Sequence, residues 1–123
     1  MSVKFEVTGT EIVVKNLKVL DKKINQELSK TFNDVALFME GEIKASVSGH
    51  RAETRSFDTG RFANSVRGRG KGLTAEISSN VEYAKFLEYG TSKLTPRRHF
   101  GNSLKRNSKK IIDFIDKAIK KAI

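Results

Sequence analysis

The stretch that decides the fold is residues 16–47, NLKVLDKKINQELSKTFNDVALFMEGEIKASV. Its apolar residues recur every three or four positions, which is the spacing of one face of an amphipathic α-helix. The stripe consists of Leu17, Leu20, Ile24, Leu28, Phe32, Val35, Met39, Ile43 and Val47. We therefore predict a long helix over these residues, with Ser29 and Gly41 as the places where it would bend.

The length of this helix carries information of its own. A helix of about 30 residues spans roughly 45 Å, whereas a chain of 123 residues folds to a radius of gyration of about 14 Å. Such a helix must kink or project from its domain. A projecting apolar stripe needs cover from a second chain, so the length predicts an oligomer.

The segments around the helix predict a small sheet and short helices. Val3, Phe5 and Val7 alternate with charged residues, which indicates a short strand, and residues 8–11 form a capping-box pattern. Residues 58–66, DTGRFANSV, predict a short helix capped by Asp58 or Thr59. Residues 65–78 predict a β-hairpin with its turn near 70–72.

The second half predicts two further helices. Residues 81–89 form a short helix that begins at a capping box of Ser79 and Glu82 and ends at Gly90. A final helix runs from Asn102 or Ser103 to residue 123. The predicted fold class is α+β, with a long N-terminal and a C-terminal helix packed on a small antiparallel sheet with a β-hairpin and short helices. Residues 1–123 form a single domain, with mobile loops near 48–57 and 91–98.

Composition excludes several classes of protein. The chain has no Cys, so disulfide scaffolds, thiolate metal sites and Cys nucleophiles are ruled out. No apolar run approaches the length of a membrane span, and the N-terminus lacks the pattern of a signal peptide. The formal net charge of +10 is unevenly placed, because residues 48–72 contribute +4 and residues 92–123 contribute +8. This asymmetry fits either a basic face for a polyanion or acidic protein, or a solvated helix face beside a flexible loop.

Three motifs are candidates for chemical sites. His50 and His99 lie in predicted loops without metal-ligand spacing to an acidic residue or to each other. Residues 68–72, GRGKG, resemble a phosphate-binding loop, but a hairpin turn explains the glycines better. Residues 58–60, DTG, match the aspartic-protease triplet, but the helical surroundings favour capping. We therefore expect no catalytic residue, no cofactor and no metal.

Nucleic-acid binding is the main alternative suggested by charge. A lysine-rich last helix could follow phosphates with a steep salt dependence. However, no helix-turn-helix, zinc finger or aromatic RNA-binding segment is present, and Phe62, Tyr83, Phe86 and Phe100 occupy core-like positions. The expectation that remains is nonspecific, architectural binding.

Two segments and a closing element resemble a known family. Residues 58–66, then 81–93 (VEYAKFLEYGTSK), then 96–100 (PRRHF) resemble the tailed-phage (siphophage) neck family of small head–tail joining and tail-component (tail completion) proteins. His99 stands where the family usually has Pro before Phe100, and Gly101 stands where a larger apolar residue is common. The motif residues, to which the resemblance assigns structural roles, are Asp58, Thr59, Gly60, Phe62, Ser65, Tyr83, Ala84, Glu88, Gly90, Thr91, Pro96 and Phe100.

The resemblance implies a non-enzymatic virion protein. It would form a homo-oligomeric ring, hexameric by this expectation, at the head–tail connector, neck or tail end. Its partners would be itself, adjacent connector or head-closure proteins, tail-tube or tail-terminator proteins, and phage DNA in the lumen, but no membrane. It would reside in the virion and, during assembly, in the host cytoplasm. The expected contacts to partners or DNA are Arg51, Arg55, Arg67, Arg69, Lys71, Lys93, Arg97, Arg98, Lys105 and Arg106.

Overall fold

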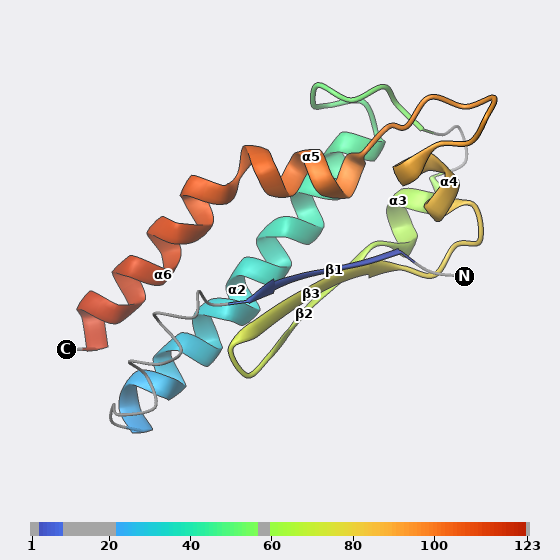
Figure 1. Cartoon of the computed structure of the whole chain (residues 1–123). Coiled ribbons are helices and arrows are strands. Elements are labelled where there is room, and N and C mark those ends of the chain that lie inside the picture. Colours follow the sequence, from blue (N-terminus) through green and yellow to red (C-terminus); the bar gives the residue numbers. More distant parts are fainter. Residues whose placement is uncertain (1–2, 9–21, 57–59, 123) are drawn as a thin grey trace.

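One long helix, α2 (Lys22–Val47), runs through the middle of the protein. In the computed structural model, which describes residues 3–8, 22–56 and 60–122, a sheet packs against this helix and two C-terminal helices lie along it (Figure 1). The arrangement confirms the predicted α+β class. The other elements are β1 (Val3–Thr8), α3 (Arg61–Ser65), β2 (Arg67–Lys71), β3 (Thr74–Ser79), α4 (Ala84–Tyr89), α5 (His99–Arg106) and α6 (Ser108–Ala122).

The apolar stripe of α2 forms the core, as its spacing predicts. Within the described part of the stripe, every side chain from position 28 onward is buried. The helix continues without interruption through Ser29 and Gly41. The prediction that the helix projects is wrong for residues 22–47, because α6 lies beside it and Ala118 packs on Leu28 (Figure 1). The start predicted at residue 16 lies outside the described residues.

The sheet has three antiparallel strands in the order β1-β3-β2. Ile77 of β3 lies opposite Phe5 on one side and Gly68 on the other, which confirms the first strand and the hairpin. The hairpin turn falls at residues 72–73, where Gly72 has a φ of 60° that favours glycine. Ala75 and Ile77 are buried and point toward the core, as their alternation predicts.

The other glycines of the GRGKG segment have a different role from the one predicted. Gly68 and Gly70 are not in the turn but in β2, directly against α2. A Cβ atom on Gly68 would lie 2.1 Å from the backbone oxygen of Ala36, and one on Gly70 would lie 2.6 Å from Cα of Asn33. Their backbone N–H groups donate to Glu40 and Asn33 of α2. These glycines therefore allow close contact between the helix and the strand.

The short helices are present, but the capping box predicted for the second of them is not. α3 has Gly60 at its N-cap, with no side-chain hydrogen bond, and Asp58 and Thr59 lie outside the described residues. α4 begins after Tyr83, so the capping box of Ser79 and Glu82 is wrong. Ser79 instead accepts a hydrogen bond from the backbone N–H of residue 81. The capping-box pattern at residues 8–11 lies mostly outside the described residues.

The C-terminal helix is divided into two. α5 begins at His99, earlier than predicted, and α6 begins at Ser108. Between them the side chain of Asn107 donates to the backbone oxygen of Ser103, 2.8 Å away, and to Glu42 of α2. Asn107 thereby ties the junction to the central helix. None of the described helices is both long and apolar enough to cross a bilayer.

Candidate assembly site at the two-loop end

Two loops and α5 meet at one end of the molecule, which we call the two-loop end: residues 48–56, residues 91–98 and α5 (Figure 1). The first loop leaves α2 at Gly49, whose φ of 87° favours glycine. It returns to the helix where the N–H of Ser56 donates to the oxygen of Val47, 2.9 Å away. The second loop is tied to α4, because the N–H of Arg97 donates to the oxygen of Leu87, 2.7 Å away.

A buried histidine joins the two loops to α2 and α5. Nδ1 of His99 lies 2.7 Å from Oγ of Ser46, and Nε2 lies 2.5 Å from Oγ of Ser56. Ser46 donates to Glu53 over 2.6 Å, and Arg97 donates to Ser56 over 3.1 Å. The chain of contacts thus runs from a guanidinium to a carboxylate through three buried side chains.

The direction of each hydrogen bond in this chain follows from counting hydrogens. Ser46 has one hydroxyl hydrogen, which it gives to Glu53, so it accepts from Nδ1–H of His99. Burial lowers the pKa of His99 to about 4, so the ring is neutral near pH 7. A neutral ring with Nδ1–H has an acceptor at Nε2, to which Ser56 donates. Every member of this hydrogen-bond chain therefore has a partner.

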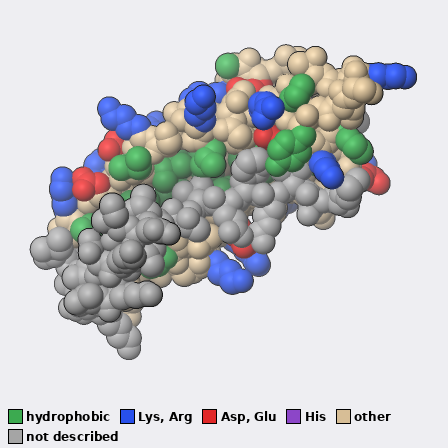
Figure 2. Space-filling view, in the orientation of Figure 1, with side chains coloured by type: hydrophobic (Ala, Val, Ile, Leu, Met, Phe, Trp, Pro, Cys, Tyr) green, Lys and Arg blue, Asp and Glu red, His purple; other side chains and the backbone are tan. Residues whose placement is uncertain are grey.

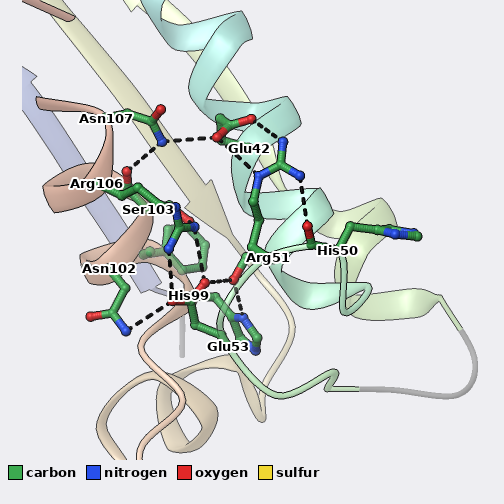
Figure 3. Close-up of polar contacts among 12 residues, drawn as sticks. Glu42, His50, Arg51, Glu53, His99, Asn102, Ser103, Arg106 and Asn107 are labelled. Atoms are coloured by element: carbon green, nitrogen blue, oxygen red, sulfur yellow. Dashed lines mark hydrogen bonds and ion pairs between the residues drawn. The ribbon is translucent and has the colours of Figure 1, made fainter. Parts of the chain in front are cut away.

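Glu53 lies at the acidic end of this chain of hydrogen bonds (Figure 3). Arg106 donates to both carboxylate oxygens, at 3.0 and 3.1 Å, and Asn102 donates over 3.2 Å. The Glu53 side chain is only 4% exposed. Burial raises its pKa, but the hydrogen bonds from Arg106, Ser46 and Asn102 outweigh that effect and lower the pKa to about 2. The first loop is thus held on α5 by an ionised carboxylate.

A second carboxylate, Glu42 of α2, also binds an arginine and an asparagine from other segments (Figure 3). Nη2 of Arg51 lies 2.6 Å from Oε2 of Glu42, and Asn107 donates to Oε1 over 3.1 Å. The hydrogen bond from Arg51 lowers the pKa of Glu42 more than burial raises it. Arg51, predicted as a partner contact, therefore forms an intramolecular ion pair.

Glu88 from the second motif caps α5. Its carboxylate accepts the backbone N–H groups of Phe100 and Gly101, each over 2.9 Å. A carboxylate there also complements the helix dipole. Burial nevertheless raises the pKa of Glu88. A Cβ on Gly101 would lie only 3.2 Å from Glu88 Oε2, which explains why a small residue stands at this position.

The remaining motif residues that the structure describes shape the same end. Phe62 makes edge contacts with Tyr83 and His99, with ring centroids 5.9 and 6.0 Å apart. Gly90 has a φ of 76°, as predicted for the end of its helix, and a Cβ there would meet Pro96 at 2.7 Å. Thr91 Oγ1 accepts two backbone N–H groups of its own loop.

The predicted contact cations fall into three groups. Arg51, Arg69 and Arg106 form ion pairs with Glu42, Glu76 and Glu53. Arg67 donates to backbone oxygens, and Arg97 donates to the first loop. The exposed cations that make no ion pair with another described residue are Arg55, Lys71, Lys93, Arg98 and Lys105. Figure 2 shows Lys and Arg side chains spread along the edges of one face, with acidic side chains between them.

Sequence reasoning missed the hydrogen-bond chain. His99 is not in a loop but opens α5, and its partners lie 53 and 43 residues away. No local spacing signals such a contact. Phe86, predicted to occupy a core-like position, is instead 43% exposed, and this prediction is wrong. Within the described residues, no three His, Asp or Glu side chains group to hold a metal ion.

Comparison with known families identifies the family of this chain. Residues 13–90, more than half of the chain, match the HK97-gp10-like family of bacteriophage tail components. The chain belongs to the HK97-gp10-like family. The predicted resemblance to tailed-phage neck and tail-component proteins is thereby confirmed, and the protein is a structural component of the phage tail, located in the virion. Searches of curated proteins and of solved structures gave no match.

The HK97-gp10-like match ends at residue 90, within the second motif. It includes Tyr83, Glu88 and Gly90 but stops before α5 and α6. The groups that Glu88 caps therefore lie beyond the matched residues. In this protein the two-loop end joins the matched part of the chain to its more basic C-terminal part.

Proposed function

We propose that this HK97-gp10-like protein forms a ring of six copies at the head–tail connector, neck or tail end, and that it joins head to tail without catalysing a reaction. Family membership supports a structural role in the tail. Exposed large apolar side chains of the described residues lie on α2, α4 and α6, and those on α2 and α4 are the observation that carries the ring. A ring uses head-to-tail contacts, and each subunit must then supply two different complementary patches.

The two apolar patches lie on α2 and α4. Leu37 of α2 is 54% exposed, although the residues around it in the apolar run are buried or half-buried. On α4, Phe86 and Tyr89 are 43% and 52% exposed, while the other face of that helix packs on α5 and β1. Aromatic side chains are enriched in the cores of protein interfaces. Both patches are available to neighbouring subunits.

The other expected partners follow from the position of such a ring. Connector or head-closure proteins would contact one side, tail-tube or tail-terminator proteins the other, and DNA would pass through the lumen. The exposed cations named above are the expected contacts to these partners. The ring would form in the host cytoplasm during assembly.

Light scattering during size exclusion tests the ring, with electron microscopy of the eluted species. We expect a discrete ring that is lost when Phe86 and Tyr89 are both replaced by Ser. Ile112→Ser is the matched control, because Ile112 is 61% exposed but lies on α6. A wild-type protein that stays monomeric at the highest concentration contradicts the proposal.

The alternative function is nonspecific nucleic-acid binding. It gains some support from Arg67, Arg69 and Lys71, which alternate along β2 and are all exposed. Arg69 is paired with Glu76, however, and this reduces the charge offered to phosphates. A monomer that shifts duplex DNA with a steep salt dependence would favour this alternative over the ring.

A further inference from the structure

A groove of about 290 Å³ lies between the two loops of the two-loop end. Residues 52–54 form one wall, residues 95–97 form the other, and Asn102 of α5 completes the lining. Both walls are fixed, because Arg97 donates to the oxygen of Arg55 over 2.7 Å and to Ser56. A site held in place before its ligand arrives loses less entropy on binding.

The two loops that form this groove carry more basic than acidic side chains. Glu53, the acidic residue in the lining, is already paired with Arg106 and accepts four hydrogen bonds. Arg97 uses Nη1 for the first loop, and within the described residues no acceptor binds its Nε or Nη2. Arg55, Lys93 and Arg98, from the same two loops, are exposed. A carboxylate-bearing ligand fits both this excess charge and the planar donors of arginine.

Backbone strain beside the groove points to the same use. Arg98 has φ 54° and ψ 41°, and it is the one described residue other than glycine with a positive φ. Left-handed backbone is unfavourable for a side chain as large as arginine, and glycine or asparagine would relieve the cost. The conformation is imposed by fixed neighbours, since Arg97 is bonded to Leu87 and Glu88 caps the next residues. Strain kept at a residue with an exposed cationic side chain indicates a function for that side chain.

We propose that this groove binds an acidic peptide segment of a neighbouring protein in the assembly, with Arg97 in its wall and Arg98, the next residue along the chain, pairing its carboxylates. The inference rests on the proposed function, because it names the kind of partner that the ring would contact. The same surface would repel a partner of like charge, so it would also set the orientation of docking.

A labelled Glu/Gly peptide tests the groove by fluorescence anisotropy, with a Gln/Gly peptide and a short DNA duplex as comparison probes. We expect the wild type to bind the acidic peptide best and to release it near 1 M salt, where the Debye length is about 3 Å. Arg98→Gly should bind roughly tenfold more weakly, about 1.4 kcal/mol, yet unfold at a higher temperature. The double variant Lys109→Ser and Lys117→Ser, which removes exposed charge from α6, should bind as the wild type does.

Three results would overturn the inference. They are equal binding of the Gln/Gly peptide, unchanged affinity in Arg98→Gly, or tighter binding of the DNA duplex than of the acidic peptide. Light scattering of the same samples separates the two proposals. Rings without peptide binding overturn the groove and leave the ring, whereas the absence of rings overturns the proposed function whatever the peptide does.

Discussion

The centre of the molecule and its two-loop end are held together by different kinds of contact. At the centre, Phe32, Val35 and Met39 of α2 are fully buried among other apolar side chains. At the two-loop end, the buried side chains include Ser46, Ser56 and His99, which are joined by hydrogen bonds. Apolar contacts tolerate small shifts, whereas a hydrogen-bond chain requires each donor and acceptor in place. The centre therefore provides stability, and the end provides fixed geometry.

The largest expected loss of stability comes from a substitution in the apolar centre. Phe32→Ala removes a fully buried ring, so the free energy of unfolding should fall by about 3–5 kcal/mol. Urea denaturation followed by circular dichroism measures it. Ile112→Ala on α6 is the control, because Ile112 is 61% exposed and lies in neither apolar patch, so its loss should cost under about 0.5 kcal/mol. Equal costs would mean that the interior of α2 is not the main support.

Lowering the pH should destabilise the two-loop end rather than the centre. His99 is neutral in the folded protein down to its pKa of about 4, whereas the unfolded chain takes up the proton near the ordinary value of 6.5. The unfolded state thus binds more protons, and stability should fall as pH drops from 6.5 to 4. Each pKa unit is worth about 1.4 kcal/mol, so the loss approaches about 3 kcal/mol.

Two carboxylates modify this pH profile in opposite senses. Glu53, with its pKa lowered to about 2, extends the loss of stability below pH 4.5. Glu88, with its pKa raised by burial, takes up its proton in the folded state first and offsets part of the loss. Unfolding curves across this range should lose the slope between pH 6.5 and 4 in His99→Gln. The slope should persist in His50→Gln, since His50 is exposed; a slope unchanged in His99→Gln would contradict the assignment.

Removing the anchor of the first loop should have a smaller, local effect. Glu53→Gln places an amide N–H₂ among donors from Arg106, Ser46 and Asn102, and we expect a cost of about 2 kcal/mol. Hydrogen exchange should accelerate at the N–H of Ser56. The matched control is Glu82→Gln, whose ion pair with Arg61 is exposed and contributes under about 0.5 kcal/mol. Faster exchange across α2 as well would show that the two regions are not independent.

The smallest expected effect concerns glycine within the centre. A Cβ on Gly41 would meet nothing within 4 Å, so Gly41→Ala should stabilise the helix by about 0.5–1 kcal/mol. Gly68→Ala, in contrast, should destabilise the protein because its Cβ would collide with Ala36. Thermal melts of the two variants should therefore shift in opposite directions. Shifts of the same sign would contradict the packing of β2 on α2.

The same contrast explains what the sequence could predict. The spacing from Leu28 to Val47 predicted the buried face of α2, and the alternation of Ala75 and Ile77 predicted that of β3. Such patterns repeat locally, so they can be read without knowing the fold. Periodicity does not show whether another element of the same chain covers a given apolar side chain. For this reason it does not predict the exposure of Phe86.

The candidate site was less predictable than the fold. The cations at the two-loop end were named from charge, but the internal roles of Arg51 and Arg106 depend on Glu42 and Glu53 from other segments. The break at Asn107 depends on a hydrogen bond across 65 residues. Capping patterns also failed at Ser79 and Glu82, because each side chain found a partner elsewhere. Long-range polar contacts of this kind leave no spacing in the sequence.

The contact between α2 and β2 has a consequence for how subunits can associate. An edge strand normally exposes backbone donors that can pair with a strand from another chain. On β2 the N–H groups of Gly68 and Gly70 already bond to Glu40 and Asn33, so this edge is closed to further pairing. Among the described strands, β1 is the other edge of the sheet. Of the described strands, β1 is therefore the one from which a sheet could continue into a neighbouring subunit.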